Sequence, residues 1–280
     1  MRQEKEEARL KAEEENSNLS GRLQIILQAL YDQDTPFEYT MTGIDKFNDI
    51  KCLLVAKQLA YNNTLKSIHI VRKEMKETSG MVFAKMLNTN KTLRKLELEG
   101  NLLGPKSATE FGKALCKNKT LKYLDLESNQ LTLDGQEFRG IYDLVEFLDH
   151  NTTLLSLNLA NNQMDEECGR MFREKMEHNH TLIDFDFSMN LFSQADSRAI
   201  QDYLVRNKRE YDAERLKEWD ERKIMREDDE KMKELQLQEQ SKKEQDRMEE
   251  EAREIREAEL NEKWKKFMLE TEIEKQQIIQ

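Results

Sequence analysis

The sequence predicts an α/β solenoid, built from stacked strand–helix repeats, followed by a long charged α-helix. Three observations support this prediction. A short apolar pattern recurs five times along the middle of the 280-residue chain. Segments with apolar residues at three- and four-residue spacing, as in amphipathic helices, lie between its copies. Residues 208–280 contain neither glycine nor proline, and more than half of them are charged.

The repeat is clearest in the stretch "NKTLKYLDLESNQL", residues 118–131. Counted from Leu121, its apolar residues occupy the first, fourth, sixth and eleventh positions, and Asn129 occupies the ninth. The leucines that begin the five copies lie 28, 28, 33 and 28 residues apart, at Leu65, Leu93, Leu121, Leu154 and Leu182. A nearly constant period of this length is the signature of a repeat architecture.

The ninth position is asparagine in the last four copies: Asn101, Asn129, Asn162 and Asn190. Positions four to six predict a short strand, after which the chain must turn away. An asparagine side chain both donates and accepts hydrogen bonds, so it can satisfy the backbone groups of such a turn. We therefore expect these asparagines to form a structural ladder rather than a binding site.

The segments between the strands predict helices, for example "SATEFGKALCKN" at residues 107–118. Asn-x-Thr stands at each boundary between units, where it predicts the exit from a helix into the next strand. The same tripeptide matches an N-glycosylation acceptor five times, at Asn62, Asn90, Asn118, Asn151 and Asn179. No secretory signal is recognised at the N-terminus, so the structural interpretation is favoured.

These repeats resemble leucine-rich repeats of the ribonuclease-inhibitor type, also found in tropomodulins and Ran GTPase-activating proteins. The resemblance implies a right-handed, curved solenoid with a parallel sheet on its concave side and helices on its convex side. Pro36, Tyr39 and Met41 fit the pattern of an irregular first repeat. The longer fourth repeat, with its extra residues within 133–151, is expected to bulge from the convex side.

Three regions are predicted along the chain. Residues 1–33 are a charged N-terminal helix and a capping helix, the latter in "NLSGRLQIILQALYDQ" from Asn18 to Gln33. Residues 34–207 are the solenoid. Residues 208–280 are an extended charged helix, because Glu210, Ala213 and Arg215 occupy the positions where a further repeat needs apolar residues.

The charged helix has three interpretations, which the sequence leaves open: a single helix that docks on other proteins, a coiled coil, or a solvated tail. Apolar residues fit heptads around Met225 and Met248, but the stripe lapses between Leu237 and Met248. Near the C-terminus, Leu260, Trp264 and Phe267 begin a stronger apolar stripe. We predict that Trp264, Phe267 and Met268 anchor a protein partner, because large aromatic residues dominate interface energetics.

The concave side of the solenoid is a second candidate surface. Strand residues alternate sides, so residues that flank the buried leucines face outward. These are largely acidic, and the candidate partner-binding residues are Glu97, Glu99, Tyr123, Asp125, Glu127, Asp184 and Asp186. Neighbouring strands lie about 4.8 Å apart, so like charges on them repel each other and a basic partner segment would relieve this repulsion. A merely solvated acidic face remains the alternative.

The composition of the chain argues against several classes of function. The net charge of −11 argues against nucleic-acid binding, and no apolar stretch is long enough to span a bilayer. Cys52, Cys116 and Cys168 are odd in number and widely spaced, which favours reduced thiols in a cytoplasmic protein. No catalytic, cofactor or metal motif is recognised, and none of the four histidines has an identifiable carboxylate partner. We expect a protein that is not an enzyme and needs no cofactor.

The combination of repeats and a charged helix resembles leucine-rich-repeat proteins of cytoskeletal assemblies, including the ciliary axoneme. It implies a scaffold or adaptor whose partners are proteins of such an assembly. Two alternatives come from the other resemblances: a small-GTPase regulator similar to Ran GTPase-activating proteins, and tropomodulin-like actin binding. Tropomodulin's actin- and tropomyosin-binding segments precede its repeats, whereas about 30 residues precede the array here. We therefore expect no co-sedimentation with actin.

Overall fold

The computed structural model describes residues 21–41 and 47–279, and describes no side chains for residue 270 or residues 272–279. The chain divides into two compact units, Met1–Ala213 and Glu214–Gln280. The predicted charged helix before residue 21 and part of the predicted capping helix lie outside the described residues.

The first compact unit contains a six-stranded parallel sheet in the order β1-β2-β3-β4-β5-β6, so each strand pairs with the strand of the next repeat. The strands are β1 Glu38–Thr40, β2 Ser67–His69, β3 Lys95–Glu97, β4 Tyr123–Asp125, β5 Ser156–Asn158 and β6 Asp184–Asp186. This unbroken order is the one expected for a solenoid, in which every repeat contacts only its neighbours.

The central residues of the strands line up in one column across the sheet: Tyr39, Ile68, Leu96, Leu124, Leu157 and Phe185. The last five are buried, with at most 5% of their surface exposed. Because side chains alternate along a strand, the residues before and after each central residue face the opposite side. The predicted register and the predicted irregular first repeat are both confirmed.

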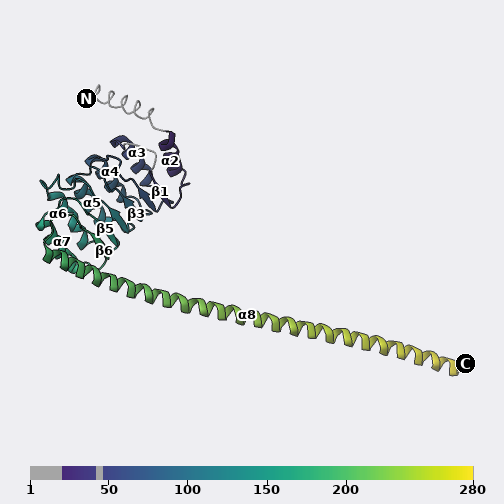
Figure 1. Ribbon diagram of the computed structural model, residues 1–280. Helices are drawn as coiled ribbons and strands as arrows, with labels where there is room; N and C mark the ends of the chain where they lie inside the picture. The colour runs from purple at the N-terminus through teal and green to yellow at the C-terminus, as the bar shows by residue number, and fades with distance from the viewer. Residues whose placement is uncertain (1–20, 42–46, 280) are drawn as a thin grey trace. The chain divides into compact units, whose positions relative to one another are not determined.

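Helices cover the other side of the buried column, outside the arc of strands (Figure 1). They are α2 Gly21–Tyr31, α3 Asp49–Leu59, α4 Glu77–Leu87, α5 Pro105–Lys117, α6 Arg139–Val145, the 3-10 helix η1 Glu146–Asp149, α7 Glu166–His178 and the beginning of α8, Gln194–Ile279. Helix α2 buries Leu23, Ile26 and Leu30, as an N-terminal cap must. The leucine-rich-repeat solenoid predicted from the sequence is therefore the observed fold.

The ninth-position asparagines clamp the turns after the strands, as predicted. Asn101 Nδ2 donates to the carbonyls of Ile70 and Leu98, both at 2.8 Å. Asn101 Oδ1 accepts from the amides of Lys73 at 2.9 Å and Met75 at 3.1 Å. Each clamp thus joins its own repeat to the preceding one. This ladder satisfies backbone groups that the turns would otherwise leave buried without partners.

A second asparagine ladder runs along the Asn-x-Thr positions. Asn118 Nδ2 donates to Leu87 O at 2.7 Å, and Asn118 Oδ1 accepts from the amides of Thr120 and Leu121 at 2.9 and 2.8 Å. The equivalent residues are at most 5% exposed: Asn62, Asn90, Asn118, Asn151 and Asn179. Their side chains end each helix and start the next strand, so the structural interpretation of this motif is confirmed.

The longer repeat is accommodated by α6 and η1, which replace the single helix of the other repeats. Helix α5 approaches α6 so closely that two glycines are required. A Cβ on Gly112 would lie 2.6 Å from Asp143 O, and a Cβ on Gly140 would lie 2.3 Å from Pro105 O. The extra length also shifts the clamp: Asn162 Oδ1 has no hydrogen-bond partner in the described part of the chain.

The array ends at Asn207, where the helix continues instead of turning into a strand. Asn207 Nδ2 still donates to Asn179 O at 2.9 Å and Leu182 O at 2.8 Å. However, Asn207 Oδ1 accepts from Arg206 Nε at 3.0 Å rather than from downstream amides. The Thr-Leu pair that follows the earlier asparagines is replaced by Arg209 and Glu210. Without a leucine to bury, the chain stays helical.

The second compact unit is the continuation of α8, which is helical throughout its described length. Oppositely charged residues one turn apart support it: Arg222 lies 3.5 Å from Glu218, and Arg247 lies 3.6 Å from Glu251. Its apolar residues are exposed, including Met225, Met232, Leu235, Met248 and Ile255. The coiled coil and the domain boundary at residue 208 remain predictions.

Candidate functional site

The concave face of the first compact unit carries two side chains from each strand, at the positions before and after the buried column. From β1 to β6 these are Glu38 and Thr40, Ser67 and His69, Lys95 and Glu97, Tyr123 and Asp125, Ser156 and Asn158, and Asp184 and Asp186. The six short strands thus place acidic residues from distant parts of the sequence on one surface.

The acidic side chains on the β1–β3 part of this face have polar partners within the chain. His69 lies between two carboxylates: its Nε2 is 2.5 Å from Glu38 Oε1, and its Nδ1 contacts Glu97 Oε2. Lys95 Nζ lies 2.5 Å from the other oxygen of Glu97. The expectation that no histidine has an identifiable carboxylate partner is therefore wrong for His69. It is also wrong for His180, whose Nδ1 lies 2.8 Å from Glu210 Oε2.

The signal for the His69 contact was present in the repeat itself. His69 and Glu97 occupy equivalent positions of adjacent repeats, which the sheet register places side by side. Reading equivalent positions across repeats, instead of neighbours along the chain, would have found the pair.

The β4–β6 part of the face is acidic and has no basic side chain at its concave positions. A hollow of about 360 Å³ lies over the middle and this end of the face, and Asp125, Asp184 and Asp186 line it together with Lys95 and Glu97. Tyr123 also lines it, with 45% of its surface exposed. This hollow is the candidate binding surface of the first compact unit, and we call it the concave hollow.

The pKa values of two carboxyl groups show the difference between the two parts. Burial is the main reason why the pKa of Asp125 rises from the ordinary 3.8 to about 6. The hydrogen bond from the Glu127 amide acts to lower this pKa, and the nearby charges of Glu127, Glu97 and Glu99 act to raise it. Burial also acts to raise the pKa of Glu97, but hydrogen bonds from Lys95 and His69 outweigh it and lower this pKa.

These shifts have opposite consequences for stability. The pKa of Asp125 is higher in the folded chain than in the unfolded chain, so its ionisation opposes folding. That destabilisation develops as the pH rises from about 4 to about 6. The pKa of Glu97 is lowered by folding, so its stabilising contribution is lost as the pH falls through the folded-state value. A cation bound beside Asp125 would favour its ionised form.

The remaining predicted concave residues have partners within the chain. Glu99 Oε1 accepts from Arg72 at 2.7 Å, and Glu127 Oε2 accepts from Asn158 Nδ2 at 2.9 Å. Both follow their strands and do not line the concave hollow. Of the predicted concave residues, the hollow therefore brings together Glu97, Tyr123, Asp125, Asp184 and Asp186. Glu99 and Glu127 stay beside it as predicted binding residues.

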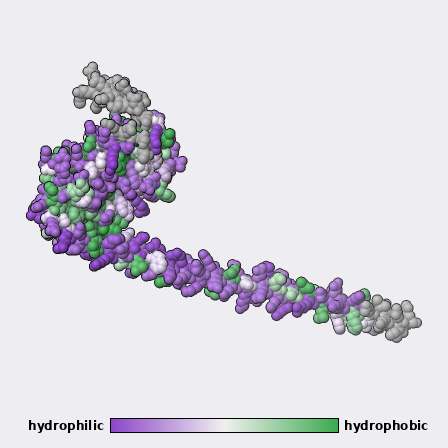
Figure 2. Space-filling model, viewed as in Figure 1, coloured by the Kyte–Doolittle hydropathy of each residue, from purple (hydrophilic) through white to green (hydrophobic). Residues whose placement is uncertain are grey.

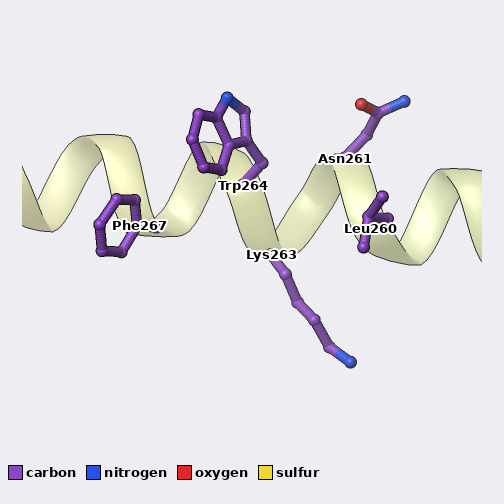
Figure 3. Close-up of a pocket in the computed structure, with 5 residues that line it drawn as sticks. All are labelled: Leu260, Asn261, Lys263, Trp264 and Phe267. Atoms are coloured by element: carbon purple, nitrogen blue, oxygen red, sulfur yellow. The ribbon is translucent and has the colours of Figure 1, made fainter.

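The predicted anchor in the second compact unit is an exposed aromatic pair on α8. The rings of Trp264 and Phe267 stack with their centroids 5.7 Å apart, and 61% and 57% of these residues is exposed. Met268 is also exposed. Figure 3 shows that Lys263 points away from the Trp264 ring. All residues that line the space of about 460 Å³ beside this pair come from α8 itself, so no second element encloses it.

Other kinds of site find no support in the described residues. The described residues include no group of three histidine, cysteine, aspartate or glutamate residues placed to hold a metal ion. Across the same residues, no helix combines the length and apolar character needed to cross a bilayer. Cys52, Cys116 and Cys168 are all free thiols.

The comparisons agree with the repeat geometry. A family profile described as Leucine Rich repeat matches residues 117–136 and 150–167, which contain β4 and β5. Together with the six-strand register, this match supports a leucine-rich-repeat protein. No curated protein sequence matches the chain.

Two solved structures are similar. One, of leiomodin-1 actin-binding site 2, has 17% identity and a TM-score of 0.48, and the match covers 70% of this chain and 94% of that one. The other is the tropomodulin C-terminal domain from Caenorhabditis elegans. It has 12% identity and a TM-score of 0.45, with 69% and 98% covered. At these values neither similarity carries an argument about this chain.

Proposed function

We propose that this chain is a non-catalytic scaffold or adaptor that binds other proteins of a cytoskeletal assembly through two surfaces. The observation that carries the proposal is the concave hollow, which Asp125, Asp184 and Asp186 line together with the exposed Tyr123. A basic segment of a partner would neutralise these carboxylates and cover the ring. Solenoids commonly bind partners along their concave surface.

The second surface is the aromatic pair Trp264–Phe267 with Met268 on α8. Exposed aromatic rings stacked on one side of a helix have the composition of an interface anchor. The rest of this helix is strongly charged and needs no packing partner. The apolar stripe therefore differs from the sequence around it. We propose that a helix or groove of a second partner covers it.

Pull-down with the full-length chain tests whether the two surfaces act separately. Asp125→Asn combined with Asp184→Asn should remove one set of captured proteins, because it removes two of the three carboxylates. Trp264→Ala combined with Phe267→Ala should remove a different set. The matched controls are Asp134→Asn, an exposed acid that does not line the concave hollow, and Leu235→Ala, an exposed apolar residue elsewhere on α8. Capture that is unchanged in both double variants contradicts the proposal.

The finer proposal is that the assembly is the ciliary axoneme and that the protein resides in the cytoplasm on its cytoskeleton. The support is the combination of a short repeat array with a long charged helix, which resembles leucine-rich-repeat proteins of axonemes. Fractionation of ciliated cells tests it directly. The protein should remain with detergent-extracted axonemes and leave them only in high salt. Recovery in the detergent-soluble fraction alone contradicts the axonemal location.

The two other functions raised by the sequence are separated by direct assays. A GTPase regulator accelerates GTP hydrolysis by a small GTPase, and a tropomodulin-like protein slows exchange at actin pointed ends and co-sediments with actin. The scaffold proposal expects no acceleration of hydrolysis and no actin in the pellet beyond the control. A positive result in either assay replaces it.

A further inference from the structure

The last strand of the sheet, β6, has an open edge. Its backbone groups on this edge are the ones that the other strands use to pair with the next strand. In the five repeats before the last, the amide two residues after the central residue donates to the next strand at 2.8–2.9 Å. Examples are Leu98 N to Asp125 O, Leu126 N to Asn158 O and Leu159 N to Asp186 O. The equivalent amide of the last repeat is Phe187 N–H. The equivalent acceptor is Ile183 O, which corresponds to Arg94 O, the acceptor of Tyr123 N. Within the described residues no strand lies beyond β6 to pair with either group.

A hollow of about 260 Å³ follows this open edge. Residues from Asp184 to Ser188 and Gln201 of α8 line it, all within the first compact unit. The half-buried rings of Phe187 and Phe192 stack behind it at 5.3 Å. Beyond the strand, Met189 and Leu191 are 75% and 68% exposed. Figure 2 shows hydrophobic residues gathered at this end of the compact unit.

We propose that this edge binds an extended segment of a partner protein, added as a seventh parallel strand. The segment has an apolar residue between two basic residues. Its apolar residue extends the column that ends at Phe185, and its basic residues lie beside Asp184 and Asp186, about 4.8 Å away in the sheet. Main-chain hydrogen bonds supply affinity, and the alternating side chains supply specificity.

Charge favours this occupant over a second copy of the chain. If β1 of another copy added to β6, the sheet register would place its Glu38 beside Asp184. If two β6 strands paired antiparallel around Phe185, Asp184 of each copy would face Asp186 of the other. Like charges at directly opposed positions destabilise strand pairing. Among the described residues, Asp184 has a hydroxyl as its side-chain partner, since Ser156 Oγ donates to its Oδ2 at 2.6 Å.

This binding mode goes beyond the proposed use of the concave hollow, because it depends on main-chain pairing. The first residue of each added strand donates its amide to the preceding strand, as Lys95 does to Lys66 O and Asp184 does to Leu155 O. The residue at the centre of the strand directs its amide away, toward the following strand. The two amides of a bound peptide therefore have different expected roles.

Fluorescence anisotropy with the full-length chain tests the proposal. The probe is a short synthetic peptide in which two lysines flank a central isoleucine. Methylation of the first lysine amide should weaken binding roughly tenfold, because it removes a hydrogen bond and places a methyl group against Ile183 O. Methylation of the central isoleucine amide is the matched control and should change the dissociation constant less than about twofold. Equal effects of the two methyl groups, or no binding of the parent peptide, overturn the proposal.

Variants and hydrogen exchange locate the bound peptide. Asp184→Asn with Asp186→Asn should weaken binding roughly threefold to tenfold, whereas Asp125→Asn should have little effect. Peptide binding should also protect the Phe187 amide from exchange. If Asp125→Asn weakens binding equally and methylation has no effect, the peptide occupies the concave hollow. The scaffold proposal then stands and the edge proposal falls. A dimer in sedimentation equilibrium that protects Phe187 without peptide also overturns it, in favour of self-association.

Discussion

Replacing Asn129 by leucine should destabilise the repeats by an amount that the hydrogen-bond ladder sets. Asn129 Nδ2 donates to the carbonyls of Leu98, Leu126 and Glu127 at 3.0–3.1 Å, and its Oδ1 accepts from Leu103 N at 3.1 Å. Leucine has a similar size and neither donates nor accepts. All four bonds are therefore lost while the space stays filled.

The four losses are not equal. Leu98 O keeps a bond from Asn101 at 2.8 Å, and Leu126 O keeps one from Asn162 at 3.0 Å. Glu127 O keeps the bond from the Gly100 amide at 2.9 Å. Only the Leu103 amide is left without an acceptor. A stranded buried donor costs about 1–3 kcal/mol, and weakening the three shared carbonyls adds about 1 kcal/mol, so we expect a loss of about 2–4 kcal/mol.

Native-state hydrogen exchange in increasing urea measures this loss. The exchange of the central amides of β3, β4 and β5 reports on the stability of the repeats. Tryptophan fluorescence would not report on it, because Trp219 and Trp264 lie on α8 in the second compact unit. Asn88→Leu is the control, because Asn88 is exposed and makes one long bond at 3.3 Å to Lys85 O. It should cost less than about 0.5 kcal/mol. Equal effects of the two substitutions would refute the ladder argument.

Three further predictions concern packing, charge and the anchor. Gly140→Ala should destabilise the first compact unit by about 1–3 kcal/mol, because its Cβ would meet Pro105 O, whereas Gly21→Ala, with open space around it, should not destabilise it; thermal unfolding of both variants decides this. Asp125→Asn should raise stability at pH 7 by about 1–2 kcal/mol and flatten the decline in stability between pH 4 and 6; a steeper decline contradicts the raised pKa. Trp264→Ala with Phe267→Ala should abolish capture of the second partner while leaving exchange in β3–β5 unchanged; slower capture of both partners contradicts separate surfaces.

Much of the fold could be predicted because the repeat reports tertiary position directly. The spacing of Leu65, Leu93, Leu121, Leu154 and Leu182 placed all the regular strands in register, and even the irregular Tyr39 took its expected place beside Ile68. Asparagine at the ninth position could be interpreted physically, because few side chains both donate and accept in a buried turn.

The candidate site was less accessible from the sequence. The acidic character of the concave face was predicted, but the pairing of His69 with Glu38 and Glu97 was not, since it joins residues that are about one repeat apart. The end of the array was recognised from the missing apolar residues. The continuous helix through Asn207 was not predicted. It depends on hydrogen bonds that Arg206 donates to the side-chain oxygen of Asn207 and to the carbonyls at the end of α7.

Crosslinking mass spectrometry of the native assembly tests the scaffold proposal most directly. Lys95 lines the concave hollow. On α8, Lys263 lines the space beside the aromatic pair, and Lys265 and Lys266 follow in the sequence. The proposal predicts that Lys95 crosslinks to one partner protein and that the α8 lysines crosslink to another. Crosslinks from both positions that reach only other copies of this chain would contradict it.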